Sequence, residues 1–240
     1  MNRRDLLTNI LGGVVLTATV LGTDISAQDN TRGRRRQRSR QLVKYPNKHF
    51  YNPDGSFNVK AAKDAYTEMF RFHNYSLPDV IKDERFWVVD FGLGDFTNVG
   101  MGGIFWLNDK EHGYFGHEIY LLPFQMIPEH AHVEAEDKPA KHEYWQVRHG
   151  SIYNFGKGGS KDDADKLPVK LPQSQLDANA ITAFKCVELK AGTGKGSEAA
   201  LSGIGDFHFM LAGANGAIVT EYASFHSNDG LKFKNPKAKL

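Results

Sequence analysis

From residue 85 onward the sequence is a succession of short apolar runs with strand-like composition and alternation, and this pattern restricts the fold most strongly. Turn signals rich in Gly, Asn and Asp separate the runs, for example at residues 157–159 and 213–216. The predicted strands are Phe86–Phe91, Gly103–Leu107, Glu118–Leu122, Gln125–His132, Glu143–Val147, Ser151–Phe155, Ala183–Leu189, Phe207–Leu211 and Ala217–Ser224. Short strands joined by tight turns indicate an all-β fold, either an antiparallel sandwich or a small barrel.

One helix is expected ahead of these strands, at residues 59–72. Its partial apolar stripe consists of Ala61, Ala62, Ala65, Met69 and Phe72. At 240 residues and 40% hydrophobic content, the chain can bury one sizeable core. Its single cysteine, Cys186, excludes an internal disulfide. We therefore expect one folded domain over residues 51–240, with the helix packed against the outside of the barrel or across one end.

The first 27 residues have the pattern of a targeting segment. Arg3 and Arg4 precede an apolar stretch, residues 10–21, that is too short to span a bilayer comfortably. Paired arginines followed by Leu-Leu resemble a bacterial twin-arginine export signal, and Ala27 is a plausible last residue before cleavage. The pattern predicts a periplasmic protein without stable membrane insertion after signal removal; an uncleaved anchor is the alternative.

Residues 28–50 are predicted to form an arginine-rich, disordered linker. Residues 28–40 hold six arginines and one aspartate, so the formal net charge of +2 conceals a charge of −3 over residues 41–240. A mildly acidic domain with a basic leader is not the pattern of a nucleic-acid-binding protein, although the leader alone could bind RNA or an anionic surface. The glycines at 192–196 lack the spacing and the strand-to-helix context of a phosphate-binding loop.

A metal site is predicted from four residues in three separated segments. His130 and His132 are two apart on a predicted strand, so both imidazoles project from one face. Glu143 follows eleven residues after His132, at the head of a run that ends in a predicted hairpin turn at Gly150. Together these three form a facial set suited to Mn, Fe, Co, Ni or Zn. A fourth ligand is expected from far along the chain, and His208, between two aromatic residues, is the best candidate.

Other residues compete for these roles. Glu134 and Glu136 lie closer to the histidine pair than Glu143 does, but Glu143 is preferred because a strand–turn–strand pattern follows it. Four further histidines are expected to face solvent and are not assigned to the metal: His112, His142, His149 and His226.

The ligand pattern resembles the two motifs of the cupin superfamily, which are small antiparallel β-barrels with a His/His/Glu/His metal site inside. The longer loop ending in Lys-His-Glu at residues 141–143 is similar to that of the cupin-type D-lyxose isomerases, a family of sugar isomerases. The resemblance covers roughly residues 55–236, including segments 91–94, 116–118, 122–125 and 217–221. It implies a cupin barrel, a bound divalent metal (Mn²⁺ ahead of Co²⁺, Fe²⁺, Ni²⁺ or Zn²⁺), a sugar substrate and a homodimer.

The same resemblance implies the reaction and further site residues. A metal acting on the sugar carbonyl, with a nearby base, interconverts D-lyxose and D-xylulose, or D-mannose and D-fructose, through a cis-enediolate. Glu221 matches the family's glutamate and is the expected base. His117 stands where family members carry a lysine and is the second expected catalytic residue. Arg148, Asn228 and Asp229 are the expected substrate-binding residues.

Two other classes of function stay open at this point. A cupin with the same ligands can be an Fe- or Cu-dependent dioxygenase, or a non-catalytic sugar-binding or metal-storing barrel of the periplasm. Glu221 distinguishes them, because an isomerase needs a base beside the open coordination positions, whereas the alternatives do not.

Overall fold

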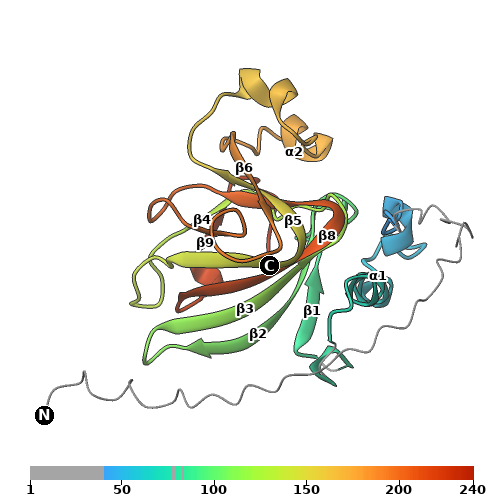
Figure 1. Cartoon of the computed structure of the whole chain (residues 1–240), viewed down its shortest axis with the longest axis horizontal. Coiled ribbons are helices and arrows are strands. Elements are labelled where there is room, and N and C mark those ends of the chain that lie inside the picture. Colours follow the sequence, from blue (N-terminus) through green and yellow to red (C-terminus); the bar gives the residue numbers. More distant parts are fainter. Residues whose placement is uncertain (1–40, 77–78, 83) are drawn as a thin grey trace, which may run out of the picture. The chain divides into compact units, whose positions relative to one another are not determined.

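The computed structural model describes residues 41–76, 79–82 and 84–240, and within these residues the fold rests on β-strands (Figure 1). The predicted export signal and the arginine-rich part of the linker, residues 1–40, lie outside the described residues. The strands are β1 (Phe86–Val89), β2 (Met101–Asp109), β3 (Tyr114–Leu121), β4 (His130–His132), β5 (Glu143–Gly156), β6 (Lys185–Lys190), β7 (Glu198–Ala200), β8 (Phe209–Ser224) and β9 (Leu231–Phe233). The helices are α1 (Val59–Phe72) and α2 (Gln173–Asp177), with short 3-10 helices η1 (Asn47–Phe50), η2 (Asp79–Lys82), η3 (Lys161–Lys166) and η4 (Asn228–Gly230).

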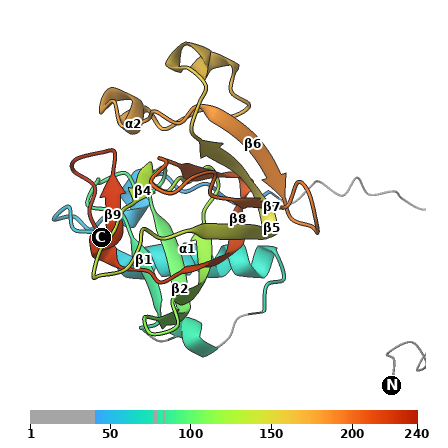
Figure 2. The same cartoon turned by 90° about the vertical axis from the view of Figure 1, so that its left-hand side faces the viewer.

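Seven strands form one sheet in the order β1-β2-β3-β8-β5-β6, with β7 paired to β5, and all of these pairs are antiparallel. β4 and β9 form a separate two-stranded sheet and lie side by side in Figure 2. The chain before β4 also runs along the start of β8. Backbone hydrogen bonds of 3.0 and 2.9 Å join His130 and His208 in both directions, and Ala212 N donates to Gln125 O at 2.9 Å. The predicted antiparallel all-β architecture is confirmed.

Two predicted turns are wrong. Instead of reversing at residues 149–150 and 213–216, the chain continues as the long strands β5 and β8, which pair with each other along most of their length. Their register shifts on either side of Gly150, as in a β-bulge. Gly150 and Gly216 have φ of 72° and 69°, and a Cβ on Gly150 would lie 2.0 Å from the Gly216 carbonyl oxygen. Glycine adopts a positive φ at little cost, so it is favoured in β-bulges as well as in turns. Here it lies within continuous strands, at positions where the sequence pattern predicts turns.

Helix α1 has the predicted bounds. It begins after Asn58, whose side-chain oxygen accepts a hydrogen bond from Ala61 N at 3.0 Å and so caps the first turn. Its buried residues are Ala62, Ala65, Tyr66, Met69 and Phe70. Tyr66 and Phe70 replace the predicted Phe72 in the stripe, and they pack with Phe86 and Tyr120 of the sheet. The helix lies beside β1, outside the sheet, as expected (Figure 1).

Residues 45–50, which the sequence analysis assigns to the linker, contact residues of the folded domain. Phe50 is 1% exposed and packs edge-on against Phe96, with ring centroids 4.8 Å apart. Thr97 Oγ1 also donates to Tyr45 O at 3.1 Å. An aromatic anchor in η1 therefore holds residues 45–50 against the domain. Across the described residues, no helix combines the length and apolar character needed to cross a membrane.

The strand registers gather side chains from distant segments into layers on the inner face of the large sheet. Phe105 on β2, His117 on β3, Glu221 on β8 and Trp145 on β5 are successive cross-strand partners. Directly paired residues in an antiparallel sheet project from the same face. The next inward-facing layer contains Gly103, Ile119, Val219 and Val147 in the same strand order. The layer that holds His117 and Glu221 is thus followed at once by a layer without polar side chains.

Candidate metal centre and active-site cavity

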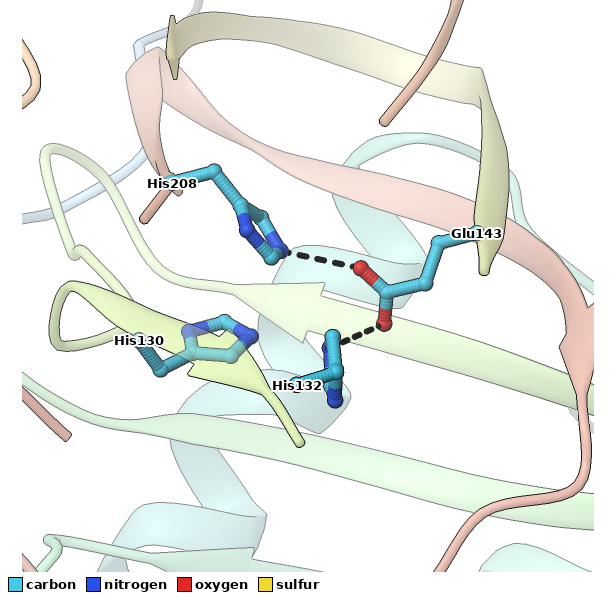
Figure 3. Close-up of side chains that lie close together, drawn as sticks. All are labelled: His130, His132, Glu143 and His208. Atoms are coloured by element: carbon cyan, nitrogen blue, oxygen red, sulfur yellow. Dashed lines mark hydrogen bonds and ion pairs between the residues drawn. The ribbon is translucent and has the colours of Figure 1, made fainter. Parts of the chain in front are cut away.

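The four predicted metal ligands meet in the folded chain (Figure 3). One potential ligand atom from each of His130, His132, Glu143 and His208 lies within 4.8 Å of the others, and all four residues are buried. His132 Nε2 is 2.9 Å from Glu143 Oε1, and His208 Nε2 is 2.9 Å from Glu143 Oε2. The bridge between His130 and His208 explains how residues 78 positions apart in the sequence come together. The set of three imidazoles and one carboxylate suits a divalent transition metal.

Backbone carbonyls orient two of the imidazole rings. His130 Nδ1 lies 3.0 Å from Pro128 O, and His208 Nδ1 lies 3.0 Å from Asp206 O. Since a carbonyl can only accept, these contacts place a proton on each Nδ1 and leave Nε2 to serve as the ligand atom. Trp145 stacks on His208 with ring centroids 5.9 Å apart and limits its rotation.

Burial and mutual contacts shift the pKa values of the group. Burial strongly lowers the pKa of His130, and the nearby His208 and His132 lower it further, so His130 is neutral. Burial alone would raise the pKa of Glu143, but Lys141 and the two histidines hold it well below its usual range. Burial alone would lower the pKa of His208, yet its hydrogen bond to Glu143 raises it. The centre therefore presents an ionised carboxylate among imidazoles, which is a donor set that a divalent transition metal can bind.

Lys141 is a central residue of the site that our sequence analysis did not assign. Its side chain is buried, and Nζ lies 2.8 Å from Glu143 Oε1 and 2.6 Å from Glu221 Oε1. The ring of Phe115 lies under the ammonium, 4.6 Å away. The two carboxylates outweigh the lowering effect of burial and raise the pKa of Lys141. A signal was present in the sequence, because Lys141 is two residues before Glu143 and in an extended chain would point to the same side.

Glu221, the predicted base, is 4% exposed and sits between Lys141 and His117. Its Oε2 is 3.1 Å from His117 Nδ1 on the paired strand. Burial alone would raise the pKa of Glu221, but the charge of Lys141 holds it below the usual value. Glu221 is therefore a carboxylate near neutral pH. Such a group can accept a proton from a molecule in the cavity.

His117 faces Glu221 with one nitrogen and the protein interior with the other. Its Nε2 is enclosed and has no hydrogen-bond partner in the structure. A Cβ added to Gly103 would lie 2.4 Å from this nitrogen, so His117 fills the space that glycine leaves open. Trp87 stacks on the ring, with centroids 5.5 Å apart. This geometry supports a positioning role for His117 toward Glu221.

His226 does not face solvent as the sequence predicted. It is 8% exposed, stacks on Phe115 with centroids 5.1 Å apart, and directs Nδ1 toward Lys141 Nζ at 3.5 Å. An ammonium can only donate, so this Nδ1 accepts, and Nε2–H donates to Asn228 Oδ1 at 3.0 Å. Burial, followed by the charge of Lys141, lowers the pKa of His226 to about 4. Phe105 and Phe115, which are distant in sequence, contact His226 and help to bury it. The polar residues next to His226 in the chain gave no sign of this burial.

A cavity of about 330 Å³ connects these groups. It is lined by the four predicted ligands and by Lys141, Glu221, His117, His226 and Asn228, with apolar side chains around the remainder.

Two of the three predicted substrate-binding residues do not line this cavity. Arg148 is exposed on the opposite face of β5 from Glu143 and donates to Gln146 Oε1 at 3.5 Å. Asp229 borders a separate, shallow hollow outside the cavity. Strand alternation reverses the side-chain direction between Glu143 and Arg148, which explains the first error. Asn228 does line the cavity, which fits the prediction made for it.

The alternative carboxylate ligands are placed elsewhere. Glu136 is exposed and contacts Lys110 Nζ at 2.9 Å and Ser227 Oγ at 2.6 Å. Glu134 is also exposed. Of the histidines excluded from the metal, His112 and His142 are exposed and His149 is half-buried outside the cavity.

Comparisons with known proteins agree with this arrangement. No family model matches the chain. The D-lyxose/D-mannose isomerase of Thermosediminibacter oceani is 29% identical over 181 residues, which cover 75% of this chain and 93% of that protein. The D-lyxose ketol-isomerase of Cohnella laeviribosi is 28% identical over 179 residues, covering 74% and 91%. The sequence resemblance to the D-lyxose isomerases is confirmed by these similarities.

Solved structures show the same fold. The L-ribose isomerase of Cellulomonas parahominis with L-ribose aligns with a TM-score of 0.53 at 17% identity, over 73% of this chain and 90% of that one. The L-ribose isomerase of Acinetobacter sp. DL28 with L-ribose aligns with a TM-score of 0.53 at 13% identity, over 75% and 94%. At these identities the likeness concerns the fold, and it confirms the predicted cupin architecture.

Proposed function

We propose that this protein is a metal-dependent aldose–ketose isomerase that interconverts D-lyxose and D-xylulose, or D-mannose and D-fructose. The observation that carries the proposal is a buried, ionised carboxylate, Glu221, in the same cavity as the four-residue ligand group. Lys141 joins the two parts, because its ammonium contacts both Glu221 and Glu143. The similarity to D-lyxose isomerases over more than nine-tenths of their length supports the same reaction class.

His130, His132, Glu143 and His208 would hold the metal, for which we propose Mn²⁺. Their buried nitrogen and oxygen atoms lie within 4.8 Å of one another, and the Lys141 ammonium lies beside Glu143. A bound divalent cation would supply Lewis-acid polarisation of the sugar carbonyl. The surrounding protein would orient the ligands through Pro128 O, Asp206 O and the Trp145 ring.

Glu221 would carry the proton between the two reacting carbons. In the aldose, C1 is the carbonyl carbon and C2 bears a hydrogen and a hydroxyl. Glu221 removes the C2 proton, the electron pair of that bond forms the cis-enediolate, and Glu221 returns the proton to C1. His117 holds the carboxylate in place through Oε2, which leaves the opposite oxygen beside Lys141.

Lys141 supplies the ammonium that the resemblance places at position 117. It keeps Glu221 ionised and lies in the cavity near the oxygens of a bound sugar. Conversion of an aldose to a ketose also requires the O2 hydroxyl proton to reach O1, and we assign this transfer to Lys141. A histidine at 117 is then compatible with activity, since the positive charge comes from the segment that precedes β5.

We further propose that the protein is exported to the periplasm by the twin-arginine route and acts as a homodimer. The Arg3-Arg4 pair ahead of a short apolar stretch supports the first statement, and the family resemblance supports the second. Cell fractionation with an Arg3→Lys, Arg4→Lys variant and light scattering of the purified protein would test them.

The central experiment is conversion of D-lyxose to D-xylulose by the purified protein with Mn²⁺ in D₂O. We expect partial deuterium at C1 of the ketose, from exchange with solvent of the proton held on Glu221, and no oxygen uptake. Glu221→Gln should lower kcat by roughly 10²–10⁴-fold, the range for loss of a general base. Glu188→Gln, an exposed glutamate on β6, is the matched control and should retain activity. Full activity of Glu221→Gln in a folded protein, or a product that depends on oxygen, would contradict the proposal.

A further inference from the structure

The cavity extends well beyond its polar groups, and most of the added wall is apolar. The polar side chains belong to the ligand group, to the cluster of Lys141, Glu221 and His117, and to the neighbouring pair His226 and Asn228. The rest of the lining consists of aliphatic, aromatic and methionine side chains. A sugar that reacts at C1 and C2 uses the polar part with those two carbons. Its remaining carbons must then occupy the apolar part.

The sheet register explains why the polar side chains occupy only one part of the cavity lining. His117 and Glu221 are cross-strand partners, and the next inward-facing residue on β3 is Ile119. On the neighbouring strands, Met101 of β2 is paired with Val89 of β1, and both line the cavity. No polar side chain stands in this part of the sheet lining among the described residues. Hydroxyls placed against it would lose their water without gaining a partner.

The wall opposite the large sheet is apolar as well. Leu231 and Phe233 on β9 are the cross-strand partners of His132 and His130, so they share the inner face of the small sheet with the two ligands. The Phe233 ring centroid is 6.1 Å from that of His130. Both residues line the cavity. A substrate held at the metal centre would therefore meet hydrocarbon on the β9 side.

Most polar atoms that border these walls are enclosed or already hydrogen-bonded. The indole nitrogens of Trp87 and Trp145 are enclosed, as is Nε2 of His117. His226 already uses Nδ1 toward Lys141 and Nε2 toward Asn228. The amide of Asn228 is left with an unused donor for a hydroxyl. Flat sugar faces can stack on aromatic rings, but outward-pointing hydroxyls still need hydrogen-bond partners.

We propose that the preferred substrate is an aldose whose end remote from C1 carries a methyl group in place of a hydroxymethyl group, that is, a 6-deoxyaldose. The inference rests on the proposed isomerase function, since it takes C1 and C2 to lie at the metal centre. The terminal methyl lies against Val89, Met101 and Ile119, and Asn228 serves one of the intermediate hydroxyls. Apolar contact then replaces the hydrogen bonds that a terminal hydroxyl would require.

The test is a matched pair of sugars that differ only at C6, D-mannose and 6-deoxy-D-mannose. We expect kcat/KM to favour the deoxy sugar by roughly 10–100-fold, the range by which one unpaired hydroxyl is rejected. Binding of both sugars to the Mn²⁺-loaded protein, measured by calorimetry, gives a readout that does not depend on turnover. Tighter binding of the deoxy sugar without turnover of either would support the apolar wall and contradict the isomerase proposal. Equal or tighter binding of D-mannose, or binding of neither sugar, would overturn the inference.

A substitution in the apolar wall tests whether that wall causes the preference for the deoxy sugar. Val89→Thr keeps the shape of the side chain and adds one hydroxyl to the wall, so it should reduce the preference for the deoxy sugar several-fold. Val187→Thr makes the same change at an exposed position on β6 and should leave the preference unchanged. An unchanged preference in folded Val89→Thr would show that the methyl group does not lie against this wall.

Discussion

Lys141→Met is the most informative single substitution, because it removes the ammonium that lies between two buried carboxylates. Lys141 Nζ contacts Glu143 at 2.8 Å and Glu221 at 2.6 Å, and all three side chains are at most 7% exposed. Methionine keeps much of the volume of the lysine stem. The substitution thus leaves the packing nearly intact but leaves two carboxylates without a counter-charge.

Breaking a buried ion pair by removing one partner costs about 3–5 kcal/mol. For a domain of this size each kcal/mol corresponds to about 2–4 °C in Tm, so the melting temperature should fall by roughly 6–20 °C. An exposed pair offers a matched control. Lys157 contacts Asp206 at 3.0 Å but its side chain is 76% exposed, so Lys157→Met should cost less than about 1 kcal/mol.

The assay is urea unfolding at pH 7 with a chelator present, followed by tryptophan fluorescence and far-UV circular dichroism. A double-mutant cycle with Glu221→Gln isolates the contact, since the double variant should lose less stability than the two single losses added together. Adding Mn²⁺ should recover part of the loss in Lys141→Met, because the cation would compensate Glu143. Stability of Lys141→Met within 1 kcal/mol of the wild type, or additive losses in the cycle, would refute the electrostatic reasoning.

Three further predictions follow from individual contacts. His226 has a folded-state pKa of about 4, below its unfolded value, so the unfolded chain binds more protons as pH falls from 6.5 to 4. Wild type should lose up to about 3 kcal/mol over this window, and His226→Gln should lose that much less in pH-dependent urea titrations. Gly150→Ala should lower Tm by roughly 10 °C or give insoluble protein, because its Cβ would overlap Gly216 O; an unchanged Tm would contradict the bulge geometry. Mn²⁺ should raise the Tm of wild type but not of Glu143→Gln in a thermal melt, and an equal rise in both would exclude Glu143 as a ligand.

The strand content and the helix were predictable because they depend on local patterns. The aromatic and β-branched residues of β1 to β3, and the capped amphipathic segment of α1, are signals that lie within a few residues of the chain. β7 and β9 were not predicted, since each has only three residues, which is too short a run to identify a strand from the sequence. Glycine at 150 and 216 was misread as reversing the chain, because a positive φ serves a bulge and a turn equally.

By itself, the sequence determined the ligand types of the candidate metal centre and the candidate base. His-x-His on a strand, a glutamate beyond a loop and a lone histidine between aromatics are chemical features that do not depend on the rest of the fold. The tertiary structure alone decided which residues surround them. Lys141 and His226 line the cavity and Arg148 does not. The path of the chain and the cross-strand register determine the face on which each side chain lies. The apolar walls of the cavity have the same origin, since strands of both sheets contribute to them and none of these strands carries the pattern alone.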